Sequence, residues 1–85
     1  MNKATQAAPP IPSTVREYTV LLEKGENNWS AYVPDLPGCI ATGKTRRDTL
    51  QLMREAIEFH IEGMRFNGED VPEPTTDSER VAIAA

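Results

Sequence analysis

Cysteine, aromatic residues and long apolar runs are all scarce in this chain of 85 residues. The single cysteine, Cys39, excludes an internal disulfide and argues against a secreted, disulfide-stabilised scaffold. The sequence contains no run of about 18 apolar residues, which excludes a transmembrane helix. No apolar segment follows Lys3 to form a secretory signal. We therefore expect a cytoplasmic protein with no membrane contact.

Positive charge is scarce as well. Nine Lys and Arg residues stand against 13 Asp and Glu residues, which gives a net charge of −4. A free-standing nucleic-acid-binding protein carries the opposite balance, a basic patch and a high pI. Only 39% of the residues are apolar, so the core must be small, and domains of this size often gain stability by association. We therefore expect this chain to pair with a partner or with a copy of itself.

The N-terminal residues differ in composition from the rest of the chain. Residues 1–15 contain three prolines among Ala, Ser and Thr and show no hydrophobic period, so we expect a flexible Pro-rich tail. Residues 16–85 carry the patterned sequence and are expected to form one domain.

Three short segments have the pattern of strands. Tyr18, Val20 and Leu22 alternate with polar residues, as in a half-buried strand. A second strand is expected from Trp29 and a third over residues 39–43. Turn-forming residues separate the strands, and this order predicts an antiparallel meander.

One long helix is expected between Thr45, a good N-cap, and Gly68, a typical residue just beyond a helix end. Its apolar residues fill a sector of about 220°, whereas one packing surface needs only about 100°. We interpret the excess as a second contact surface, for another subunit. A final strand is expected over residues 79–84. The residues assigned to self-association are Leu52, Phe59, Phe66, Val81 and Ile83.

Catalytic and metal-binding patterns are weak. His60 and Cys39 are single residues without a surrounding signature, and both are more often packed side chains than catalytic ones. One Cys and one His do not make a zinc site, and the glycines are scattered rather than gathered in a phosphate loop. We therefore expect no enzyme activity, no metal and no cofactor.

Charge is distributed unevenly along the helix. Residues 42–54 carry a net charge of +3, whereas residues 55–79 carry eight carboxylates and one arginine, a net charge of −7. The basic group is either an anion-contacting patch or ordinary solvated charge. The carboxylates of residues 55–79, which we call the acidic ridge, either serve solubility or complement a basic protein.

Several of these segments together resemble the N-terminal domain of HicB-type antitoxins. The similar segments are YTV at 18–20, WSAYVPDLPGC at 29–39, ATGKT at 41–45, REAI at 54–57 and GEDVP at 68–72. The resemblance implies an α+β domain of order β-β-β-α-β, with one long helix packed on the sheet, described for this family as a degenerate RNase H-like fold. It also implies self-association, as a homodimer or tetramer. The expected partner is a small basic HicA-type toxin, an mRNA-cleaving RNase whose active site the antitoxin covers.

The expected toxin-binding residues combine the acidic ridge with the segment at 29–39. They are Glu55, Glu58, Glu62, Trp29, Tyr32 and Asp35. Many relatives carry a C-terminal DNA-binding segment, and because this chain ends at Ala85 we expect none here and no direct DNA binding. Two alternatives remain: a stand-alone structural or regulatory homo-oligomer without a toxin, and a residual metal-dependent nuclease. The nuclease is disfavoured because its metal ligands would be carboxylates on the inward face of the strands, and the first strand has Tyr18, Val20 and Leu22 there.

Overall fold

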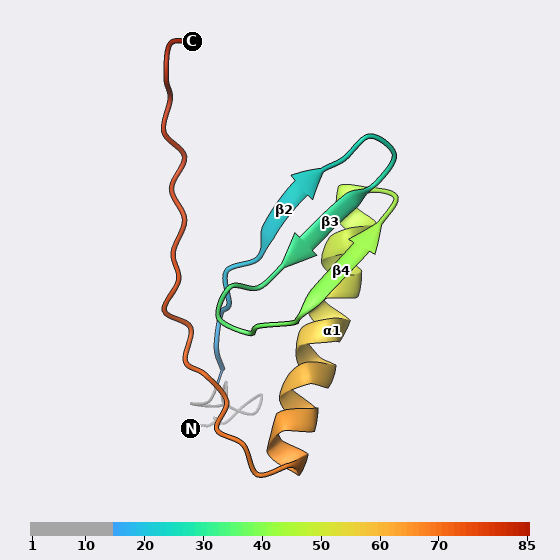
Figure 1. The fold of residues 1–85 in the computed structure, drawn as a ribbon, viewed down its shortest axis with the longest axis vertical. Coiled ribbons are helices and arrows are strands. Elements are labelled where there is room, and N and C mark those ends of the chain that lie inside the picture. Colours follow the sequence, from blue (N-terminus) through green and yellow to red (C-terminus); the bar gives the residue numbers. More distant parts are fainter. Residues whose placement is uncertain (1–14) are drawn as a thin grey trace, which may run out of the picture.

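The computed structural model describes residues 15–85, so all but the last residue of the expected Pro-rich tail lies outside the described residues. Three strands form one sheet in the order β2 (Leu21–Lys24), β3 (Trp29–Tyr32) and β4 (Ile40–Gly43), and both pairings are antiparallel. One helix, α1 (Arg46–Phe66), covers one face of the sheet (Figure 1). The predicted meander followed by a long helix is therefore confirmed.

The two strand connections follow from their turn residues. The Gly25 N–H donates to the Asn28 carbonyl at 2.7 Å and closes the first turn. In the second turn Gly38 has a φ of +87°, a conformation that glycine adopts without steric cost. The first strand begins at Leu21, later than the alternation predicts. Before it, Arg16, Tyr18 and Thr19 bond through their side chains to the C-terminal segment and not through a backbone ladder.

The ends of α1 match the local signals. The Thr45 hydroxyl oxygen accepts a hydrogen bond from the Asp48 N–H at 3.0 Å and caps the N-terminus. At the other end Gly68 has a φ of +73°, and its N–H donates to the Arg65 carbonyl at 3.1 Å. These bonds satisfy backbone groups that a helix end leaves free.

The core is small and lies between α1 and the sheet. Its fully buried apolar residues are Ala31, Val33, Leu36, Cys39 and Met53. The helix lies mainly against β3 and β4 and contacts β2 much less. The side of the sheet that carries β2 is therefore left less covered.

The C-terminal segment follows a separate course. Residues 69–85 lie outside any helix or strand; they pass along residues 16–19 and then run away from the body to the C-terminus (Figure 1). Val81 and Ile83 are 73% and 74% exposed. The final strand predicted at residues 79–84 is not confirmed, because in this single chain the segment lies apart from the sheet edge with which it would have to pair.

Candidate protein-binding surface

Asp35 anchors the C-terminal segment to the turn after β3. Its carboxylate accepts the backbone N–H groups of Thr76 and Thr75 at 2.9 and 3.0 Å, and their hydroxyls at 2.8 and 3.1 Å. These hydrogen bonds, with the Thr76 N–H first, hold the pKa of Asp35 below its ordinary value. Asp35 was assigned to toxin binding from the sequence, but its carboxylate is engaged within its own chain.

A second set of contacts ties the same segment to the residues before β2. Arg16 donates from Nη1 to the Val71 carbonyl at 3.2 Å and forms an ion pair with Glu73 at 3.1 Å. The Tyr18 hydroxyl donates to the Pro72 carbonyl. The start and the end of the domain are thereby joined along residues 71–76.

An exposed apolar row lies on the side of α1 that turns away from the core. Leu52, Phe59 and Phe66 are 43%, 78% and 90% exposed. They recur every seven residues, so they lie above one another on the helix. The second apolar stripe expected from the sequence is therefore uncovered in this chain.

Carboxylates stand between these apolar residues. Glu55 and Glu62 are exposed and lie four residues before Phe59 and Phe66, the spacing at which helix side chains are neighbours. The result is a single row of alternating apolar and acidic side chains. We call this row the outer stripe: Leu52, Glu55, Phe59, Glu62 and Phe66. Glu58 lies to one side of it, toward the groove described below.

The two aromatic residues of β3 point to opposite sides of the sheet. Trp29 shares the phase of buried Ala31 and faces the helix side, where it is half-buried. Tyr32 is 43% exposed on the other side and is paired across the strands with Leu21 and Ile40, so these three side chains form an apolar row there. Tyr32 and the helix glutamates therefore do not share one surface.

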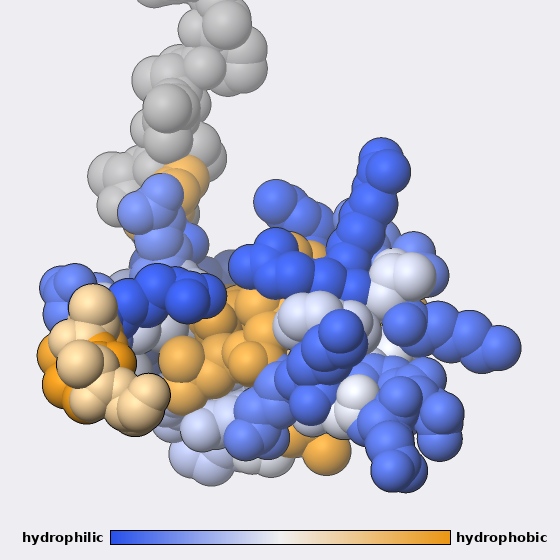
Figure 2. Space-filling model, turned by 90° about the horizontal axis from the view of Figure 1, so that it is seen from above, coloured by the Kyte–Doolittle hydropathy of each residue, from blue (hydrophilic) through white to orange (hydrophobic). Residues whose placement is uncertain are grey.

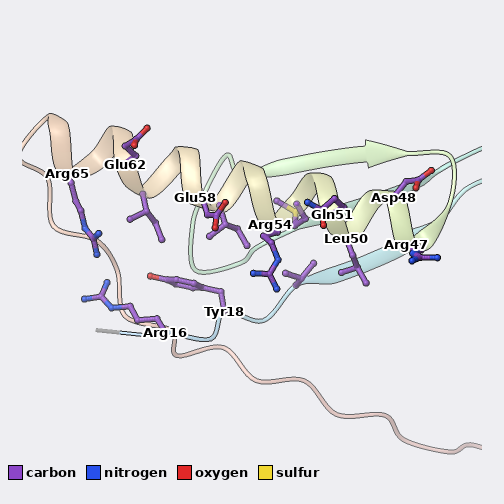
Figure 3. Close-up of a pocket in the computed structure, with 14 residues that line it drawn as sticks. Arg16, Tyr18, Arg47, Asp48, Leu50, Gln51, Arg54, Glu58, Glu62 and Arg65 are labelled. Atoms are coloured by element: carbon purple, nitrogen blue, oxygen red, sulfur yellow. The ribbon is translucent and has the colours of Figure 1, made fainter. Parts of the chain in front are cut away.

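A groove of about 1040 Å³ runs between α1 and the residues that precede β2. Tyr18 and Arg16 lie on one side of it, and the side chains of Arg54 and Arg65 extend toward them from the helix (Figure 3). Its apolar lining consists of Tyr18, Val20, Leu50, Met53, Ile57 and Ile61. On the face seen from above in Figure 2, apolar surface lies between charged side chains on either side.

The candidate reactive residues have ordinary packing positions. Cys39 is 3% exposed, and burial raises the pKa of its thiol, which disfavours the nucleophilic thiolate. His60 is half-buried on α1. Among residues 15–85, no three His, Cys, Asp or Glu side chains are grouped so that they could hold a metal ion. Over the same residues, α1 lacks the apolar length needed to cross a membrane.

Comparison with known proteins identifies the family of this chain. The family model described as "HicB_like antitoxin of bacterial toxin-antitoxin system" matches residues 18–83. The chain belongs to the HicB-like antitoxin family. Its fold, a three-stranded antiparallel sheet with one long helix, is the fold expected from the resemblance, apart from the final strand.

Individual HicB-like relatives differ in length. A UPF0150 protein of Thermoplasma acidophilum is 36% identical over 70 residues, which cover 81% of this chain and 99% of that protein. The Antitoxin HicB 2 of Photorhabdus laumondii is 30% identical over 66 residues, 73% of this chain and 45% of that protein. This HicB-like chain therefore spans less than half of the length of that antitoxin.

A solved structure supports the same assignment. A chain in a HicA3 and HicB3 toxin-antitoxin complex superposes with a TM-score of 0.61 at 32% identity, and the match covers 71% of this chain and 70% of that one. Sequence reasoning identified this HicB-like family, but it missed the contacts of Asp35 and Arg16 with the C-terminal segment. Those contacts join residues 40 or more positions apart and leave no local signal.

Proposed function

We propose that this chain is a non-enzymatic, cytoplasmic antitoxin that binds a small basic HicA-like toxin and covers its active site. Membership of the HicB-like family and the similarity to a chain in a HicA3–HicB3 complex support this proposal. The degenerate RNase H-like description and the self-association of the domain belong to the same proposal.

The outer stripe is the observation that carries the proposed mode of binding. Exposed apolar side chains supply area to bury, and the carboxylates between them attract and orient a basic surface. From the sequence, Leu52, Phe59 and Phe66 were assigned to self-association. If two copies paired through this stripe, Glu55 and Glu62 would face like charges, so we assign the stripe to the toxin and self-association to Val81 and Ile83.

The remaining residues expected to bind the toxin are distributed around this stripe. Glu58 lies beside it on the groove side and extends its negative charge. Tyr32 and Trp29 belong to other faces of the sheet, so in this proposal they contribute little to the same contact. The Asp35 carboxylate accepts a hydrogen bond from the Thr76 N–H of its own chain, so in this proposal it positions the C-terminal segment.

The test first asks whether a HicA-like protein is encoded beside this chain's gene, and then uses that protein. Coexpression is expected to yield a stable complex in which RNA cleavage by the toxin is abolished. The double variant Glu55→Lys/Glu62→Lys is expected to weaken binding about tenfold or more, by loss of charge attraction. The matched control Glu17→Lys/Glu23→Lys makes the same change in net charge at exposed positions outside the stripe and is expected to bind normally.

Two results would contradict the proposal. If the proteins elute separately at micromolar concentration, or if no HicA-like neighbour is encoded, the stand-alone homo-oligomer becomes the better account. If both double variants weaken binding equally, the effect reflects net charge, and the outer stripe is not the contact surface.

A further inference from the structure

We propose that residues 79–84 of one chain lie as an added strand along β2 of a second copy, with Val81 and Ile83 inserted into the groove beside α1. The exchange would be reciprocal, so that two copies form a closed dimer. This inference deepens the self-association in the proposed function and names the segment and the site that carry it.

The groove is an apolar site that this chain leaves unfilled. The helix lies mainly against β3 and β4. The apolar side chains of Leu50, Ile57 and Ile61 line the groove across from Tyr18 and Val20, the residues that lead into β2. β2 is at the edge of the three-stranded sheet, and an edge strand presents backbone groups that can pair with another segment. One more strand beside β2 would complete the layer beneath this side of the helix.

The exposed end of the chain has the pattern such a strand requires. Val81 and Ile83 alternate with Arg80, Ala82 and Ala84, and both apolar side chains are about three-quarters exposed. In Figure 2 an apolar group marks this end of the chain, at the left. Six residues of strand extend about 20 Å, and the helix from Leu50 to Ile61 rises about 16 Å, so the lengths agree.

Charge at the groove also suits this segment. Arg54 and Glu58 lie at the rim of the groove, and Glu79 and Arg80 begin the segment that would enter it. Glu79 can then pair with Arg54, and Arg80 with Glu58, while Val81 and Ile83 enter the apolar part of the groove.

The tail does not fit the groove of its own chain. The Thr19 hydroxyl donates to the Thr76 carbonyl at 2.6 Å, which fixes residue 76 beside residue 19. Continued alongside β2 from this point, the segment would bring Asp77 next to Val20 and Glu79 next to Leu22, both on the helix-facing side. Two carboxylates would then enter an apolar site, which is costly, and Val81 and Ile83 would lie beside Lys24 and beyond.

A second copy removes this conflict. Its tail is free from residue 77 onward and approaches the groove without the register that Thr19 imposes. Residues 77 and 78 then serve as the crossing between the two bodies, so the acidic Asp77 stays at the surface.

Crosslinking between differently tagged chains tests the exchange. In a Cys39→Ala background, a chain with Val81→Cys is mixed and refolded with a chain carrying Ile57→Cys, and a short bismaleimide is added. The expected product is a covalent heterodimer. The control partner carries Phe59→Cys, on the opposite side of α1, and is expected to give none. Absence of the heterodimer, or closure within one chain of the Ile57→Cys/Val81→Cys double variant, would overturn the proposal.

Light scattering provides an independent readout that needs no crosslink. Val81→Asp/Ile83→Asp is expected to reduce the mass to that of the 9.4 kDa monomer. Ala82→Asp/Ala84→Asp adds the same charge on the other side of the same segment and is expected to leave the dimer intact. If the wild-type chain is monomeric at all concentrations, the exchange is contradicted but toxin binding is not. If an intact dimer fails to bind the toxin, the proposed function is contradicted but the exchange is not.

Discussion

Asp35 illustrates how much of this small structure depends on single side chains. One carboxylate accepts four hydrogen bonds from Thr75 and Thr76 and so fixes the C-terminal segment against the turn after β3. The segment contains neither helix nor strand, so side-chain contacts of this kind replace a backbone ladder. Removal of the charge is therefore expected to release the segment without unfolding the core.

The lowered pKa of Asp35 makes this anchor dependent on pH. Because the folded pKa lies below the unfolded value of about 3.9, the stabilising contribution is fully present above that value and is lost as pH falls through the folded pKa. At pH 6, Asp35→Asn is expected to lose hydrogen-exchange protection at the Thr75 and Thr76 amides, and wild type is expected to lose it only in strong acid. Equal protection in the two proteins at pH 6 would contradict the anchor.

Two glycines provide a matched pair of stability predictions. A Cβ at Gly43 would lie 2.7 Å from the Thr49 hydroxyl oxygen and 3.1 Å from its backbone nitrogen, so Gly43→Ala is expected to destabilise the chain by about 1–3 kcal/mol. A Cβ at Gly63 meets nothing within 4 Å, and Gly63→Ala is expected to stabilise α1 by about 0.5–1 kcal/mol. Urea unfolding at one fixed chain concentration measures both, and a loss of stability at Gly63 would be the contrary result.

At the scale of elements, α1 has one side for folding and one for binding. Met53 is fully buried and Phe59 is 78% exposed. Met53→Ala is expected to cost about 2–5 kcal/mol of unfolding free energy through cavity formation. Phe59→Ala is expected to change it by less than about 0.5 kcal/mol but to weaken toxin binding. Urea unfolding and a binding titration separate the two effects, and equal losses of stability would contradict this division of the helix.

The elements also show how far local sequence determines this fold. Thr45 and Gly68 mark the ends of α1 because caps are local hydrogen-bond devices, and the uncovered Phe59 and Phe66 follow from helix periodicity alone. The groove was not predictable, since it depends on how far α1 is displaced from β2. Similarly, alternation at Val81 and Ile83 predicts a strand, but sequence does not say which edge that strand would meet.

At the scale of the whole molecule, the modest net charge of −4 conceals a separation of roles. The start of α1 is positively charged, and the outer stripe, with Glu55 and Glu62, is negatively charged. One helix therefore carries two surfaces of opposite charge. The small core is consistent with a domain that completes its packing by exchange of its tail with a second copy. The outer stripe then remains free on each copy for a basic partner.

The central claim is that this chain neutralises a small basic RNase, and an inhibition titration tests it most directly. A HicA-like protein found encoded beside this chain is assayed on labelled RNA while this chain is added in increasing amounts. We expect cleavage to fall to zero at a fixed stoichiometry, and we expect inhibition to weaken as salt rises, because the contact depends on charge. Undiminished cleavage at a molar excess of this chain would contradict the claim.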